Sequence, residues 1–511
     1  MRLNRSENTK RNIIIGMTDK LTGVLLPFAV RTMLLHKMGA EYLGLTGLFY
    51  SILQALNLAE MGFGTAIVYH MYRPIAHNDK AMINALLSFY RKVYRAVGAA
   101  VAVMGLSVMP FLHLLIRGDV PADICIYALY LIYLTNTCIS FFVFPERKAL
   151  LTAHQREDIG GRVHIVTQFL MYAAQGASIC LTKNYYLYAA MMPGASLFYS
   201  LWCARRTKKK YPEYTGGGKI EPGQEKEIRR QVVGLTIRKL AVTSRNALDS
   251  VFVSAFLGLG ATAVYGNYYY IMDSVVMLLA VVRTSMAGGV GNGIALDSRE
   301  KNLGTMHQIN FLFMWISGWC SICLLCLYQP FMRMWAGEEM MLPFGIAVLL
   351  AVYFYVLKMG DIRTLYAESA GIWWQARYIS VAEAGTNLVL NWVLVRAMGL
   401  AGIILATLIS YLVFNFFGGA VILFRYYFTQ GGLAKYFGAQ GRYAAVTGIV
   451  AVITYMAVMA VSRVVMSGIL GFAVKAAVCA VLPNLLYGCI YGKTKDVKDS
   501  RHLIEGLLKM R

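Results

Sequence analysis

The chain has 511 residues, of which 58% are hydrophobic and only 15% are charged. A soluble protein of this length carries more charge, so the composition excludes an ordinary soluble domain. The formal net charge of +23 would also fit a nucleic-acid-binding protein, but the basic residues lie in short loops between apolar runs. We therefore attribute the charge to membrane topology and to attraction for anionic lipid, and we expect no nucleic-acid partner.

Apolar runs of about 20 residues recur along the whole sequence, long enough to cross a hydrocarbon core of roughly 30 Å as helices. They show no period-two alternation, which argues against strands. The first run is interrupted by Asp19, Lys20 and Pro27 and is followed by no cleavage site, so we expect a retained helix and no signal peptide. The fourteen predicted spans are 13–35, 43–70, 94–116, 123–145, 162–182, 185–204, 231–256, 263–291, 309–329, 341–360, 377–396, 399–424, 443–462 and 468–491.

The loops between these spans alternate in charge. One set, which includes the N-terminus, the 205–230 loop and the C-terminal tail, holds most of the cations. Cations are retained on the cytoplasmic side of a membrane, so both termini are predicted to be cytoplasmic in a multi-pass protein. The outer set holds at most one cation per loop, namely Lys37, Arg117, Lys183, Arg333, Arg396 and Arg463.

An internal repeat is visible without a gap when Met38–Leu53 is placed over Leu257–Met272, since Gly39 then meets Gly258 and Gly47 meets Gly266. The repeat predicts two pseudo-symmetric six-helix bundles of parallel topology, followed by two extra C-terminal helices. The expected fold is an all-α polytopic membrane protein. Its predicted parts are an N-terminal lobe over 1–210, a basic linker over 211–230, a C-terminal lobe over 231–427, and a helix pair with an amphipathic tail over 428–511.

Four segments carry a resemblance to a known family. NLVLNWVLVRAMGLAGIILATLIS (387–410) resembles the signature of polysaccharide-export flippases in the multidrug/oligosaccharidyl-lipid/polysaccharide (MOP) superfamily. Three further segments resemble one bacterial branch of it: EMGFGTAIVYHMYRPIAHND (60–79), KKYPEYTGGGKI (209–220) and YGNYYYI (265–271). The resemblance covers essentially the whole chain and implies two lobes in a V, as in multidrug (MATE) transporters, with a central cavity and alternating access.

The same resemblance implies a function without enzymatic chemistry. Such flippases move undecaprenyl-diphosphate-linked oligosaccharides, O-antigen units among them, from the inner to the outer leaflet of the bacterial cytoplasmic membrane. The implied partners are the lipid-linked oligosaccharide, membrane lipid and other polysaccharide-assembly proteins. In members with two extra helices, the pair borders a groove suited to a lipid tail.

Ionisable residues inside spans are costly and usually face a partner or a wet cavity. Arginine binds a diphosphate through bidentate hydrogen bonds and lysine binds it as a point charge. The candidate diphosphate ligands are Lys20, Arg31, Arg245 and Arg283. An alternative reading pairs Arg245 with Asp249 and Lys20 with Asp19 as structural ion pairs.

If an ion gradient of H⁺ or Na⁺ drives transport, a carboxylate must load and release the ion. The candidates are Asp19, Glu60, Asp249 and Asp273. Asn387 and Asn391, one helical turn apart in an apolar span, are better explained as amides that bind a neighbouring helix.

No catalytic constellation stands out, and the nine cysteines lie almost entirely in apolar runs, with no metal or cofactor indicated. Two other classes remain as alternatives. A MATE-like cation or drug antiporter needs an acidic cavity, whereas the predicted spans carry more Lys and Arg than Asp and Glu. A polysaccharide polymerase or ligase is expected to carry a large outer loop, and every predicted outer loop is short.

Overall fold

The computed structural model describes residues 5–56, 63–117, 120–154, 156–218, 220, 223, 248–429, 432–464, 468–494, 497 and 500. Within these ranges the regular structure is helical and no strand occurs. The chain forms two compact units, Met1–Ala263 and Val264–Arg511, which are described separately.

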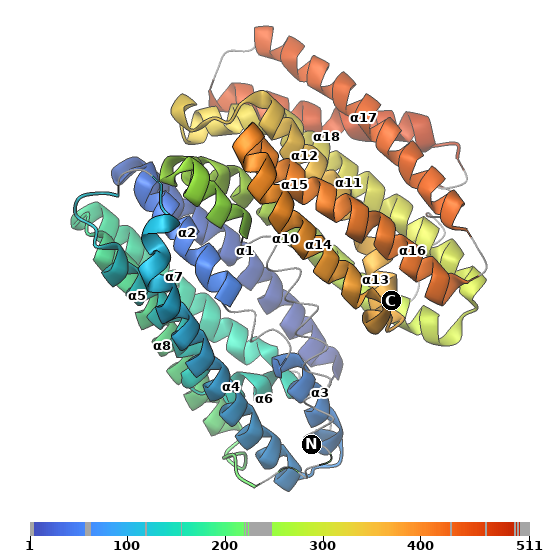
Figure 1. Cartoon of the computed structure of the whole chain (residues 1–511). Coiled ribbons are helices and arrows are strands. Elements are labelled where there is room, and N and C mark those ends of the chain that lie inside the picture. The colour runs from blue at the N-terminus through green and yellow to red at the C-terminus, as the bar shows by residue number, and fades with distance from the viewer. Residues whose placement is uncertain are drawn as a thin grey trace. The chain divides into compact units, whose positions relative to one another are not determined.

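The first unit is a bundle in which α1 packs on α7, α7 on α8, and α8 on α5 (Figure 1). The short helix α6 follows α5 after a bend of 52°. The helices of this unit are α1 (Arg5–Lys37), α2 (Ala40–Leu56), α3 (Phe63–Ala76), α4 (Lys80–Val108), a 3₁₀ turn at Met109–Leu114, α5 (Ile126–Phe142), α6 (Pro145–Ala153), α7 (Glu157–Leu181), α8 (Tyr185–Lys210) and a shorter helix at Leu248–Leu257.

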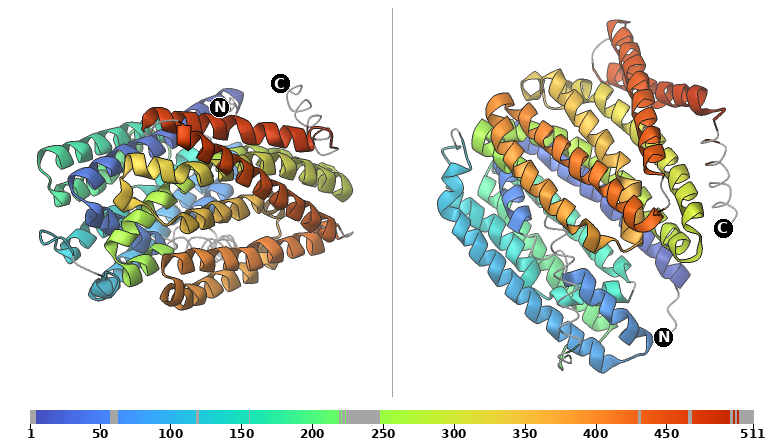
Figure 2. Two further views of the ribbon diagram at one scale, coloured as in Figure 1. Left: turned by 90° about the horizontal axis from the view of Figure 1, so that it is seen from above. Right: turned by 45° about the vertical axis from the view of Figure 1, so that its right-hand side comes forward.

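In the second unit, α11 packs against α12 and against the C-terminal pair α17 and α18 (Figure 2). Two π-helical segments interrupt the span that follows α14. The elements are α10 (Leu259–Leu296), α11 (Arg299–Trp335), a 3₁₀ turn at Glu338–Met340, α12 (Phe344–Met359), α13 (Asp361–Ser369), α14 (Trp373–Met398), α15 (Leu400–Ser410), the π-helical Tyr411–Gly418, α16 (Gly419–Leu423), the π-helical Phe424–Phe428, α17 (Leu433–Val464) and α18 (Ile469–Tyr491).

Twelve of the fourteen predicted spans coincide with helices. The second, 43–70, takes in parts of α2 and α3 and the undescribed residues 57–62, and the seventh lies mostly outside the described residues. Seven described helices are long and apolar enough to cross a membrane, or eight if α5 and α6 form one bent span. The remaining predicted spans are shorter or more polar, as α1 is with Asp19, Lys20 and Arg31. The all-α polytopic fold class is confirmed. The predicted division at 211–230 stays a prediction, because 224–247 are not described.

The two glycines that the repeat aligns have the same backbone conformation. Gly39, between α1 and α2, has φ +116°, and Gly258, before α10, has φ +93°. Residues with a Cβ atom rarely adopt such positive φ angles, so each of these two turns favours glycine strongly. The matching turns support the register of the proposed repeat.

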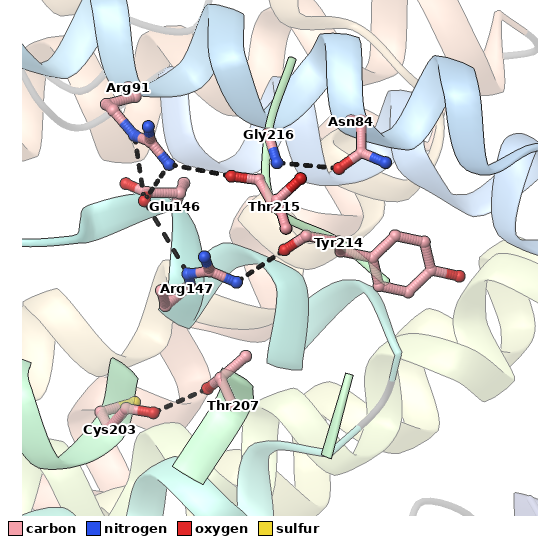
Figure 3. A network of polar contacts seen from close by, with 9 residues as sticks. All are labelled: Asn84, Arg91, Glu146, Arg147, Cys203, Thr207, Tyr214, Thr215 and Gly216. Atoms are coloured by element: carbon pink, nitrogen blue, oxygen red, sulfur yellow. Dashed lines mark hydrogen bonds and ion pairs between the residues drawn. The ribbon is translucent and has the colours of Figure 1, made fainter. Parts of the chain in front are cut away.

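A segment we call the strap, Tyr211–Gly218, leaves α8 and binds the ends of α4 and α6 (Figure 3). Arg147 donates to the backbone oxygen of Tyr214 at 2.7 Å, and the amide of Gly216 donates to the side chain of Asn84 at 2.8 Å. The His154 ring lies 4.4 Å from the ring of Tyr211. Burial lowers the pKa of His154, so its imidazole is neutral at neutral pH.

Glu146 is the charged centre beneath the strap. Its side chain is buried and accepts two hydrogen bonds from Arg91, at 2.8 and 3.1 Å, while Arg147 lies 4.0 Å away (Figure 3). Arg91 also reaches the backbone oxygen of Thr215. One carboxylate therefore neutralises two arginines that hold the strap.

The first prediction concerns this carboxylate. Glu146→Gln should lower the free energy of unfolding by about 2 kcal/mol, because two arginines then lose their counter-charge in a partly buried place. The matched control is Glu338→Gln, whose ion pair with Arg333 is exposed and should change stability by less than about 0.5 kcal/mol. Unfolding in mixed micelles of increasing SDS content measures both. Equal effects of the two substitutions would contradict this account of the strap.

Candidate transport site

The first unit contains a partly open cavity of about 550 Å³, which is lined by α1, α2, α5, α6, α7 and α8. Its wall is mixed, with carboxylates, amides, hydroxyls and a lysine beside tyrosine rings. The polar and aromatic lining residues are Asp19, Tyr50, Asn136, Lys148, Thr152, Glu157, His164, Thr167, Gln168, Tyr172, Ser196 and Tyr199. A cavity of this composition suits a hydrated or hydroxyl-rich ligand better than an apolar one.

One wall of the cavity is a chain of hydrogen bonds between α1 and α7. His164 Nδ1 lies 2.7 Å from Asp19 Oδ1, and His164 Nε2 lies 3.1 Å from the amide nitrogen of Gln168. His164 and Gln168 are one helical turn apart, so α7 presents both to the same face. Histidine is the side chain whose charge changes within the physiological range. A carboxylate bonded to an imidazole is therefore an arrangement that can hold or pass on a proton.

The opposite wall is built by α5, α6 and α8. Ser196 donates to the side chain of Asn136 at 2.6 Å. Lys148, on α6, lines this cavity and also a smaller adjoining one of about 130 Å³. Glu157 and Lys148 add one charge of each sign to the lining, so the cavity is not uniformly acidic.

The structure gathers few of the predicted site residues. Asp19 lines the cavity, whereas Lys20 is exposed and Arg31 half-buried on the same helix, and neither of them lines it. Asp249 is buried in the Leu248–Leu257 helix. Glu60 and Arg245 lie outside the described residues, which leaves the predicted Arg245–Asp249 pair untested.

Two predicted residues lie on α10 in the second unit. Arg283 forms an ion pair with Glu368 of α13 at 2.5 Å, and the two side chains are 24% and 28% exposed. Asp273 is half-buried. Arg283 is therefore held by a carboxylate in this conformation, and an anionic ligand would have to compete with Glu368 for it.

The two asparagines of the signature segment form consecutive hydrogen bonds. Asn387 is fully buried and donates to Thr407 of α15 at 3.0 Å, while Asn391 donates to Asn387 at 3.3 Å. The prediction that an amide locks α14 to a neighbouring helix is confirmed for Asn387, whereas the hydrogen bond from Asn391 to Asn387 lies within α14. Arg396, near the end of the same helix, lies over the ring of Trp392.

A second buried polar chain crosses the π-helical segment Tyr411–Gly418. Arg363 donates to the side chain of Asn415 at 2.6 Å, and Asn415 donates to Glu383 at 3.1 Å. Arg363 and Glu383 are both buried, so Asn415 links a cation and an anion that lie on different helices. Helical segments with π geometry are often retained at functional positions.

Sequence reasoning missed most of the cavity lining, including His164, Gln168, Asn136 and Lys148. A usable signal existed only for His164, which is an ionisable residue within a predicted span. Lys148 falls between the predicted spans 123–145 and 162–182, and in the structure it lines the cavity from α6, which bends by 52° from α5.

No protein-family model matches the sequence, and no curated protein sequence matches it closely. Solved structures do match. An inward-facing MATE-family multidrug resistance transporter of the MOP superfamily aligns with a TM-score of 0.63 at 13% identity, over 83% of this chain and 99% of that one. The lipid II flippase MurJ, in an inward closed conformation, aligns with a TM-score of 0.66 at 10% identity, over 94% and 99%. A MOP transporter from Pyrococcus furiosus aligns with a TM-score of 0.58 at 13% identity, over 84% and 96%.

The chain is thus a polytopic membrane protein with the fold of transporters. More particularly, it shares this fold with a MATE-family transporter of the MOP superfamily and with the lipid II flippase MurJ. The resemblance seen in the sequence is confirmed at the level of the fold.

Proposed function

We propose that the protein is a flippase that moves an undecaprenyl-diphosphate-linked oligosaccharide from the inner to the outer leaflet of the bacterial cytoplasmic membrane. It would act by alternating access and serve cell-surface polysaccharide biosynthesis. The observation that carries the substrate class is the extent of the two matches, because the lipid II flippase MurJ covers a larger share of the chain than the MATE transporter does.

The coverage of the matches supports this choice. The MATE transporter covers 83% of the chain and the lipid II flippase covers 94%. The difference, about a tenth of the chain, is close to the combined length of α17 and α18, which have 32 and 23 residues. The extra share of the chain that the lipid II flippase MurJ covers is therefore about as long as this helix pair, which favours a flippase over a drug transporter.

The physical requirement of this cargo also fits. A diphosphate without counter-charges in a low-dielectric passage would be prohibitively costly, so fixed cations must accompany it. We assign Lys20, Arg31, Arg245 and Arg283 to this task. Release requires that several weak contacts share the affinity, and the ion pair of Arg283 with Glu368 supplies a competitor for the phosphate.

The two alternatives are less well supported. A transporter of cationic drugs needs an acidic pocket. The cavity of the first unit has two carboxylates, Asp19 and Glu157, but Lys148 offsets one of them, and the MATE transporter covers less of the chain than the lipid II flippase does. The similar solved structures are transporters and a flippase, which does not favour a polymerase or ligase.

We also propose that both termini are cytoplasmic. The connections before and after α8 should then lie on opposite sides of the membrane. Reporter fusions at Lys183 and at Lys210, which bracket α8, measure this directly. The account predicts an outer location for Lys183 and a cytoplasmic one for Lys210, and the same side for both would refute it.

Arg283 gives the sharpest test of the diphosphate assignment. Arg283→Ala should reduce export at least about tenfold, and Arg283→Lys should rescue it poorly if the contact is bidentate. Arg396→Gln, which removes an exposed cation near a helix end, should leave export near normal. The measurement is complementation of a flippase-deficient strain, with the membrane level of each variant determined.

A purely structural role for Arg283 must be separated from cargo binding. Arg283→Ala leaves Glu368 without its cation, whereas Arg283→Ala/Glu368→Ala removes both charges. A structural pair predicts that the double variant regains export. The cargo assignment predicts that it remains inactive at normal abundance, and recovery would overturn the assignment.

We further infer that proton movement through Asp19 and His164 drives the cycle, with Glu60, Asp249 and Asp273 as the other carboxylate candidates. Asp19→Asn should abolish the part of export that depends on an imposed pH gradient, because the amide cannot load a proton. Asp123→Asn is the matched control, since Asp123 is an exposed carboxylate bonded to Tyr42. Normal gradient-dependent export by Asp19→Asn in membrane vesicles would exclude this coupling site.

A further inference from the structure

The second unit contains a separate pocket of about 590 Å³ between the ends of α11, α12, α17 and α18. Its walls are mainly apolar. The apolar lining residues are Leu325, Cys326, Pro330, Met334, Phe344, Tyr455, Val458, Met459, Gly468, Gly471 and Phe472. Four polar residues complete it, namely Gln329, Arg333, Ser462 and Lys475. An apolar pocket with two cations has the chemistry to bind an anionic amphiphile.

All four helix ends that form this pocket belong to the side that the loop charges assign to the outer leaflet. Arg333 lies in the last turn of α11, and Ser462 lies near the end of α17. Arg333 is the single cation of its predicted outer loop, and Lys475 adds a second cation to the pocket from within α18. The positive-inside tendency does not explain a lysine at this place in a span, so Lys475 needs another explanation.

Lys475 is the residue that most requires a partner. It lies six residues into α18, which at 1.5 Å per residue is about 9 Å from the helix start. Its side chain is half-buried, and within the described part of the chain it forms no ion pair. An ammonium group at this depth in a membrane costs free energy. The cost falls when the flexible lysine side chain extends towards the membrane surface and places the ammonium group beside an anion.

Arg333 is placed to share that anion. It pairs with Glu338 at 3.1 Å, but the two side chains are 63% and 76% exposed, so the ion pair is weak. Glu338 does not line the pocket. A phosphate in the pocket can therefore bind the guanidinium without displacing a buried contact.

We propose that this pocket binds one anionic phospholipid of the outer leaflet, with its phosphate between Arg333 and Lys475 and an acyl chain along the apolar walls. A zwitterionic lipid, whose head group carries an ammonium group, fits less well because it would place a third cation beside Arg333 and Lys475. The bound lipid fills the space between α11 and the C-terminal pair and so stabilises their packing. This proposal does not depend on the transported cargo.

The test is native mass spectrometry of the full chain in mild detergent, titrated with phosphatidylglycerol or phosphatidylcholine of the same acyl chains. Phosphatidylglycerol should bind the wild type more tightly than phosphatidylcholine. Lys475→Gln should weaken the first phosphatidylglycerol site about fivefold, and Arg333→Gln/Lys475→Gln about thirtyfold. The matched control is Arg463→Gln, an outer cation of the same corner that does not line the pocket, which should change affinity less than about twofold.

Thermal unfolding separates lipid binding from damage to the fold. Without lipid, Lys475→Gln should melt no lower than wild type, because it removes from an apolar helix a charge that has no ion-pair partner among the described residues. Added phosphatidylglycerol should raise the melting temperature of the wild type and of Arg463→Gln but not of the double variant. Equal binding of both lipids, equal binding by all variants, or a site that takes undecaprenyl phosphate and not phosphatidylglycerol would each overturn the proposal.

Discussion

A polar group without a partner in hydrocarbon costs several kcal/mol, and this cost determines how the chain is built. It makes the backbone helical, since only a helix satisfies the amides within one segment. It also explains the side-chain pairs. Asn387 binds Thr407, Asn415 links Arg363 to Glu383, and Arg283 binds Glu368, each time between different elements.

The same desolvation cost explains what these pairs would do in the proposed transport cycle. A carboxylate that neutralises Arg283 in one state can yield to a diphosphate in another, because either partner satisfies the cation. In the proposed cycle the Asp19–His164 hydrogen bond has the corresponding part, with a proton in place of the phosphate. A transporter of a charged head group needs such replaceable partners. A cycle built on permanently neutral pairs could not release its cargo.

How much the sequence could predict follows from the range over which each interaction acts. Hydrophobic runs, turn glycines such as Gly39 and Gly258, and the pairing of Asn387 with the next helix are local, and all were predictable. The partners of Arg283 and Asp19 are not local. Glu368 lies 85 residues from Arg283, and His164 lies 145 residues from Asp19. Periodicity gives the face of a helix but not its neighbour, so the predicted charges could not be sorted into a cavity.

The central claim is that the protein carries a lipid-linked oligosaccharide across the bilayer, and reconstitution tests it most directly. Purified protein in vesicles that contain undecaprenyl-diphosphate oligosaccharide in both leaflets can be probed with a membrane-impermeant sugar-oxidising reagent. The account predicts that the oxidised fraction rises from the outer-leaflet share to nearly all of the glycolipid. An unchanged fraction with folded protein in every vesicle would contradict it.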